Sequence, residues 1–140
     1  MPGTKDARAA YRLSPEERQK GEARLRVGEM LLYCFPGSPT VYYGDEAGME
    51  GFEDPLNRKT YPWDRQDRAL LDFFRSLGQL RRHRPSLQDG DLTYVYAQGG
   101  ALVLRRQLGD EITVAALNAG ETAVEVSLPW PRDLAREALT

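Results

Sequence analysis

The sequence predicts an α/β region followed by an all-β region, and two patterns carry that prediction. Up to about residue 85, an apolar stripe with helical spacing is followed by a short strand that is apolar on both sides, which is typical of a parallel α/β unit. After Pro85 the apolar period changes from 3.6 to 2, and strand-like segments separated by turn residues start nine to eleven positions apart. This second pattern predicts an antiparallel meander within a β-sandwich. We therefore expect two regions, 1–86 and 87–140.

The first helix has the clearest local signals. Ser14 supplies a capping hydroxyl, Pro15 stands at the first helical position, and Glu17 completes a capping box. Residues 36–39 contain two prolines and must end this helix, because proline cannot continue it. Residues 1–13 show no apolar periodicity, so we expect a loosely ordered lead-in.

The remaining elements follow from residue type. Residues 40–43 are β-branched and aromatic and predict the short strand, whereas residues 47–63 predict a long irregular loop, which is usually functional or disordered. A second helix is expected to begin near Asp64 and to end before Pro85. Strands are expected at 92–97, 101–106, 111–117 and 122–128, with no further strand in 129–140.

Composition excludes several classes of protein. The 140 residues include 19 Lys and Arg against 21 Asp and Glu, a net charge of −2, which leaves no basic surface for nucleic acid or an anionic membrane. A single cysteine and a single histidine exclude a disulfide scaffold and a Cys/His metal site. The longest apolar run, 30–35, is too short to span a membrane, and no signal peptide is visible. We expect a soluble, cytoplasmic chain without a metal or cofactor.

Two linked motifs point to a family. The segment 36–49, PGSPTVYYGDEAGM, resembles the eighth barrel strand of the alpha-amylase family of glycoside hydrolases. Its continuation through Asp54-Pro55, Arg58 and Pro62-Trp63 resembles the neopullulanase, cyclomaltodextrinase and maltogenic amylase branch. The resemblance covers about residues 14–128. It implies the last part of a TIM (β/α)8 barrel, a helix-strand-loop-helix portion, followed by a partial antiparallel C-terminal β-sandwich domain.

The resemblance also implies a reaction. Family members are retaining enzymes that act on α-glucans with two carboxylates and a third acidic residue, all on strands before the eighth. The His-Asp motif that holds the third is absent here, because His83 is followed by Arg84. We therefore expect part of a glycosidase acting on maltodextrin, cyclodextrin or pullulan, without catalytic residues and inactive alone. A non-catalytic carbohydrate-binding or accessory module is the alternative. Linkage specificity and oligomeric state are not predicted.

The long loop contains the candidate substrate-binding residues. Asp54 and Arg58 stand four apart, and a carboxylate and a planar guanidinium can each bind sugar hydroxyls or orient one another. By resemblance the pair contacts substrate on the non-reducing side, and a loop-stabilising ion pair is the alternative. Phe52 and Trp63 are candidate platforms for stacking on sugar rings, or they pack beneath the loop.

Tyr43 and Glu46 are expected to have structural roles near the site. For Tyr42 and Tyr43, packing in the core is the favoured interpretation. Asp45 and Glu46 are adjacent acids, but neighbouring residues of a strand point to opposite faces, so they cannot jointly flank one glycosidic bond. By resemblance, Glu46 supports the end of the barrel through hydrogen bonds and Asp45 lies at the edge of the cleft.

Overall fold

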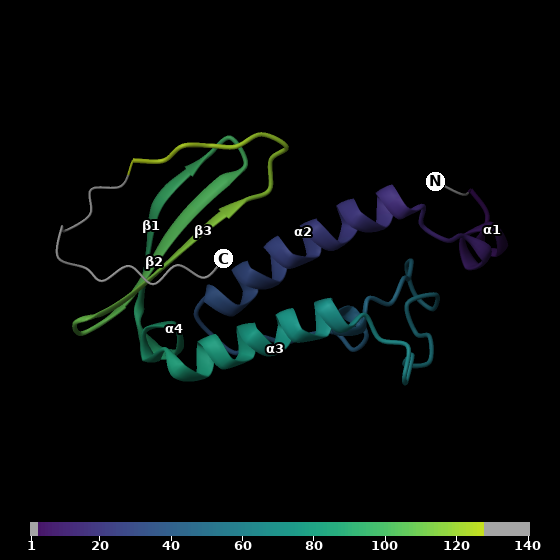
Figure 1. Ribbon diagram of the computed structural model, residues 1–140, viewed down its shortest axis with the longest axis horizontal. Helices are drawn as coiled ribbons and strands as arrows, with labels where there is room; N and C mark the ends of the chain where they lie inside the picture. Colours follow the sequence, from purple (N-terminus) through teal and green to yellow (C-terminus); the bar gives the residue numbers. More distant parts are fainter. Residues whose placement is uncertain (1–2, 128–140) are drawn as a thin grey trace.

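The computed structural model describes residues 3–127, in which two long helices lie side by side against a three-stranded sheet (Figure 1). Both long helices begin at the end of the molecule that carries the long loop, and both run towards the sheet. The helices are α1 (Lys5–Ala10), α2 (Pro15–Cys34), the short 3-10 helix η1 (Asp45–Ala47), α3 (Arg68–His83) and α4 (Pro85–Asp89). The strands are β1 (Asp91–Gln98), β2 (Ala101–Leu108) and β3 (Glu111–Asn118).

The capping box predicted for α2 is confirmed. The Ser14 hydroxyl accepts a hydrogen bond from the Glu17 backbone N–H at 3.2 Å, and the Glu17 carboxylate accepts one from the Ser14 N–H at 2.8 Å. The expectation of a loosely ordered segment before α2 is wrong for residues 5–10, which form the helix α1. The Thr4 hydroxyl accepts from the Ala7 N–H, so local capping starts a helix that buries none of its residues.

The strand expected at residues 40–43 does not form. Residues 38–42 have no regular secondary structure, and none of the strands in residues 3–127 pairs with them. A strand needs a neighbour to accept and donate its backbone hydrogen bonds, so β propensity alone does not produce one. The second helix begins later than expected, since Asp67 is its N-cap and accepts from the Leu70 N–H at 2.9 Å. It ends before Pro85, as predicted.

Three of the four predicted strands are confirmed. They form one antiparallel sheet in the order β1-β2-β3, with an irregularity in register between Tyr94 and Tyr96. The fourth prediction is wrong over residues 122–127, which contain no strand, and its last residue lies outside the described residues, as does 129–140. Where a fourth strand would have continued the sheet, the Asn118 side-chain amide donates a hydrogen bond to the Thr122 carbonyl at 2.8 Å. Val124 is exposed.

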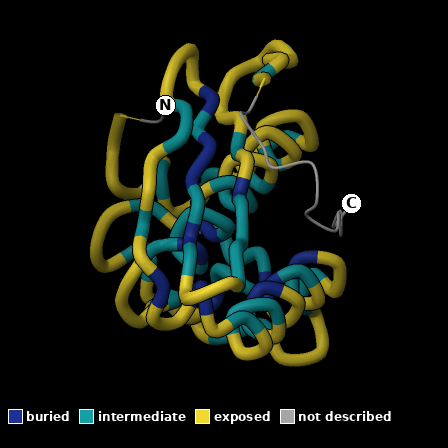
Figure 2. The backbone as a smooth tube through the Cα atoms, turned by 90° about the vertical axis from the view of Figure 1, so that its left-hand side faces the viewer, coloured by how far each residue is buried: buried dark blue, intermediate teal, exposed yellow. Residues whose placement is uncertain are grey.

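The main core lies where α2 ends against the sheet. A buried cluster is formed by Cys34, Leu87, Leu104 and Ala115. Arg106, which is also fully buried, donates hydrogen bonds from β2 to the carbonyls of Gly90 and Cys34. Arg81 of α3 donates to the Tyr33 and Phe35 carbonyls. Figure 2 shows that buried stretches are short and that most of the backbone is half-buried or exposed.

A smaller contact joins α3 to η1. Leu70, Phe74 and Leu77 are buried on α3, and Ala47 is buried in η1. None of the helices in residues 3–127 combines the length and the apolar character needed to cross a membrane.

Candidate functional site

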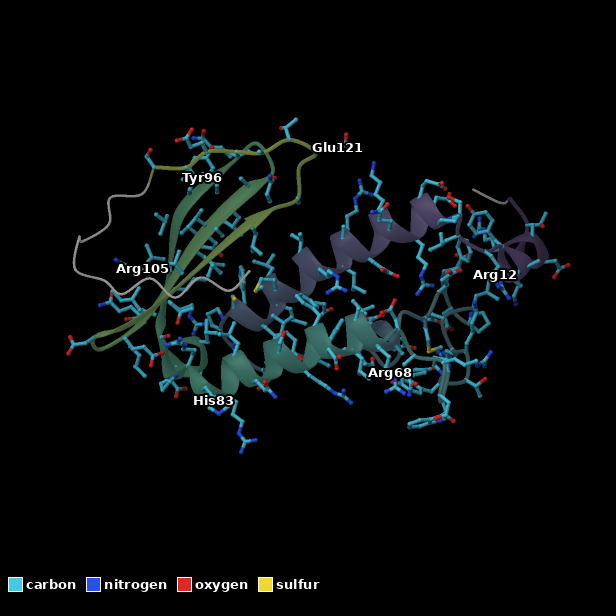
Figure 3. All side chains as sticks on the ribbon, in the orientation of Figure 1. Arg12, Arg68, His83, Tyr96, Arg105 and Glu121 are labelled. Carbon is cyan, nitrogen blue, oxygen red and sulfur yellow. The ribbon has the colours of Figure 1, made fainter. Side chains whose placement is uncertain are left out.

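The site loop, residues 44–67, lies at the end of the molecule opposite the sheet (Figure 3). In this view the side chains of the loop gather between Arg12 and Arg68, far from Tyr96 and Arg105 of the sheet. The loop therefore sits where the two long helices begin.

The loop opens with a tight turn that glycine makes possible. Gly44 has a φ of 96° and accepts hydrogen bonds at its carbonyl from the Ala47 and Met49 N–H groups, at 3.1 and 2.9 Å. The Glu46 carboxylate accepts from the Gly44 N–H at 2.9 Å and from the Tyr61 hydroxyl. Glu46 thus connects the start of the loop to its later part.

Asp45 and Glu46 lie in the 3-10 helix η1, so the expectation from strand alternation does not apply to them. Their surroundings differ nonetheless. Glu46 is hydrogen-bonded, whereas burial, and then the charge of Glu46, raise the pKa of Asp45.

Asp54 and Arg58 contact one another directly. Arg58 Nε lies 2.5 Å from Asp54 Oδ1, and both side chains are mostly exposed. Two turns bring them together, with the Leu56 N–H donating to the Glu53 carbonyl and the Arg58 N–H donating to the Pro55 carbonyl. The pair is exposed and joins two residues of the same loop, so its geometry is compatible with both interpretations of the sequence.

The two candidate aromatic platforms have different surroundings. Trp63 is 74 % exposed, and its ring centroid lies 4.6 Å from that of Tyr61 at an interplanar angle of 53°. Phe52 is half-buried and meets Tyr11 edge to face, with centroids 6.0 Å apart. Trp63 offers an open ring, whereas Phe52 lines a mainly apolar cavity of about 380 Å³ with Tyr11, Leu13, Leu25, Met49 and Leu70.

Tyr42 and Tyr43 do not pack in a core, contrary to the favoured expectation. Both are exposed, their ring centroids lie 5.0 Å apart, and the Tyr43 hydroxyl donates to the Lys59 carbonyl at 3.0 Å. The reason is that no strand of residues 3–127 pairs with this segment and covers it. Tyr43 does have a structural contact at the site, because it reaches the far side of the loop.

Glu29 is a buried acid that the sequence did not single out. It lies on α2, is 8 % exposed, and its Oε2 has no hydrogen-bond partner. Burial, and then the charge of Asp45, raise the pKa of Glu29 above its ordinary value of 4.5. No sequence signal marks it, because a glutamate within a helix is normally exposed.

We expect Glu29→Gln to stabilise the protein at pH 7. A carboxyl whose pKa is raised on folding favours the folded state below its unfolded pKa, and this contribution is lost as the pH rises through the folded pKa. Removing the unpaired charge should raise the free energy of unfolding by about 1 kcal/mol at pH 7. This stabilisation of the variant over wild type should shrink as the pH falls towards 4.5, because the wild-type carboxyl then becomes protonated and neutral. Urea unfolding at both pH values measures this difference, with exposed Glu125→Gln as control. A variant less stable than wild type at pH 7 would contradict it.

Comparison with known proteins identifies relatives of this chain. No protein-family model matches the chain. Over 133 residues it is 34% identical to an amylopullulanase of Thermoanaerobacter thermohydrosulfuricus, a match that covers 82% of this chain and 9% of that protein. Over 113 residues it is 36% identical to a maltogenic alpha-amylase of Bacillus acidopullulyticus, covering 76% and 19%. The chain therefore spans less than a fifth of the length of these curated relatives.

Solved structures agree with the sequence matches. An alpha-amylase from Geobacillus thermoleovorans, solved with acarbose, superposes with a TM-score of 0.67 and 39% identity, over 71% of this chain and 22% of that one. A debranching enzyme from Nostoc punctiforme superposes with a TM-score of 0.69 and 36% identity, over 73% and 21%. In both sequence and fold, this chain belongs to the alpha-amylase family of glycoside hydrolases, as a region that corresponds to a short part of those enzymes.

Proposed function

We propose that this chain contributes a substrate-contacting region to an enzyme that hydrolyses α-glucans such as maltodextrin, cyclodextrin or pullulan. Relatives named amylopullulanase, maltogenic alpha-amylase and cyclomaltodextrinase support this substrate class. In this proposal region 1–86 is the end of a (β/α)8 barrel, and region 87–140 is part of a C-terminal β-sandwich domain. The catalytic carboxylates come from residues outside this chain, which leaves it inactive alone.

The exposed Asp54–Arg58 pair is the observation that supports this role best. Its ion pair uses only one of the five guanidinium donors, so the other N–H groups of Arg58 are available to sugar hydroxyls. Trp63 presents an open aromatic ring on the same loop, and such rings stack on the apolar faces of sugars. Phe52 contributes to the wall of the neighbouring cavity, and Tyr43 and Glu46 hold the loop in shape.

We expect Arg58→Ala to weaken maltoheptaose binding by about 10- to 100-fold, because it removes hydrogen bonds from a charged donor worth about 1.5–3 kcal/mol. Isothermal titration of the 140-residue chain with maltoheptaose measures the dissociation constant. Arg65→Ala is the matched control, since Arg65 is an exposed arginine of the same loop, and its affinity should equal that of wild type. Wild-type chain that fails to bind at millimolar maltoheptaose would contradict the proposal.

A reducing-end assay on the same samples tests the second half of the proposal. We expect no hydrolysis of maltodextrin by the purified chain. Release of reducing ends that tracks the protein through purification would show that catalytic groups lie within these 140 residues.

A further inference from the structure

The site loop is held by a second segment of the chain, residues 8–18, which we call the docking segment. It comprises the end of α1, the linker to α2 and the first turn of α2. Arg8 forms an ion pair with Glu53, Tyr11 packs its ring against Phe52, and the Leu13 N–H donates to Glu50 Oε2 at 3.3 Å. These contacts join residues that lie 37 to 45 positions apart in the chain.

Arg18 contacts four residues, and three of them belong to the site loop. Its Nε lies 2.8 Å from Glu22 Oε1 one turn along α2. Its Nη1 lies 3.2 Å from Glu50 Oε1, and its Nη2 lies 3.5 Å from the Gly48 carbonyl and 3.6 Å from Asp67 Oδ2. One guanidinium therefore reaches both the beginning and the end of the site loop.

The partners of Arg18 are themselves fixed to the loop. Asp67 caps α3, and its N–H donates to the Ala47 carbonyl at 3.1 Å. Lys59 Nζ donates to the Glu50 carbonyl at 2.8 Å, which connects the middle of the loop to its beginning. Gly48 leaves space for the guanidinium, because a Cβ at that position would lie 2.8 Å from Arg18 Nη2.

We propose that Arg18 is a positioning residue for glucan binding: it holds the two ends of the site loop and so sets the places of Asp54, Arg58 and Trp63. This inference rests on the proposed function of the loop. Arg18 contacts none of these three residues, so its influence passes through Glu50, Gly48 and Asp67.

The physical basis is preorganisation rather than global stability. Partly exposed ion pairs contribute little to the free energy of unfolding, because solvent screens them. A loop that is already held in its bound shape loses less conformational entropy when a ligand binds, so loosening it weakens affinity. Lysine cannot replace Arg18, since a single ammonium group does not present the planar fork that reaches four partners.

Hydrogen exchange of the full 140-residue chain, paired with maltoheptaose titration, tests this role. In Arg18→Gln we expect amides of residues 48–59 to exchange at least fivefold faster, and maltoheptaose affinity to fall about fivefold, with the urea midpoint nearly unchanged. Arg18→Lys should behave like Arg18→Gln. Arg24→Gln removes the same charge from an exposed position of the same helix and should leave both measurements at wild-type values.

Glu50→Gln provides an independent check through a double-mutant cycle. Because Arg18 acts through Glu50, the double variant should bind maltoheptaose about as weakly as Arg18→Gln alone. Unchanged exchange in Arg18→Gln would overturn the proposal, and so would faster exchange with unchanged affinity. If wild-type chain binds no glucan, the proposed function fails and the binding role of Arg18 fails with it, while the exchange rates still show whether Arg18 holds the loop.

Discussion

Arg106→Met is expected to lower the free energy of unfolding by about 3 kcal/mol or more. Arg106 is 0 % exposed, and its Nε and Nη2 donate to the Gly90 carbonyl at 3.1 and 2.8 Å. Its Nη1 donates to the Cys34 carbonyl at 2.7 Å. The side chain therefore connects the sheet to the last residue of α2.

Two opposing effects decide the size of this loss. Burial lowers the pKa of Arg106, so removing its charge recovers some desolvation energy. The substitution also leaves two buried carbonyl groups without a donor, at a cost of about 1–3 kcal/mol each. Apolar replacement of a buried charge is neutral only when its partners are replaced too, and backbone carbonyls cannot be. The loss of hydrogen bonds therefore outweighs the gain.

Urea unfolding followed by far-UV circular dichroism measures this loss. Arg106→Lys keeps the charge but cannot donate to both carbonyls with the same geometry, so we expect a loss nearly as large. Arg82→Met is the control, since Arg82 is exposed on α3 and the change should stay within about 0.5 kcal/mol. An Arg106→Met variant within 1 kcal/mol of wild type would show that the carbonyls find other donors.

Leu104→Ala is expected to lower the free energy of unfolding by about 2–5 kcal/mol. Leu104 is fully buried on β2 and packs with Cys34, Leu87 and Ala115, so truncation leaves a cavity among residues from α2, α4 and β3. Both the lost transfer energy and the cavity contribute to the cost.

Leu108→Ala supplies a matched comparison on the same strand. Leu108 is 42 % exposed, so its truncation removes little buried surface and should cost less than about 1 kcal/mol. Equal losses for the two leucine variants in urea unfolding would contradict the placement of the core between α2, α4 and the sheet.

Elements with local signals were predictable from the sequence. The capping box of Ser14 and Glu17 and the stop before Pro85 need only neighbouring residues, and both are confirmed. The three paired strands were also predictable, because glycine turns link them directly and each finds its partner nearby in the chain. The strand expected at residues 40–43 failed for the opposite reason, since it has no neighbour among the described strands.

The contacts of the candidate site likewise fall into those that the sequence could predict and those that it could not. The contact between Asp54 and Arg58 could be anticipated, because four residues in a tight loop bring opposite charges together. The contacts of Arg18 with Glu50 and Asp67 could not, since those residues lie 32 and 49 positions away. The roles of Asp54, Arg58, Phe52 and Trp63 in substrate binding stay predictions.

The sequence by itself determined the helix caps, the turns, the alternating strands and the family motif of the site loop, because each depends on residues that are close in the chain. Only the tertiary structure decided that Arg106 is buried, that Glu29 has an unpartnered oxygen, and that Arg18 holds the loop. The physical reason is that burial and ion pairing depend on groups that the fold brings together from distant parts of the chain. From sequence alone, a charged residue is predicted to be exposed, because its distant partners are not known.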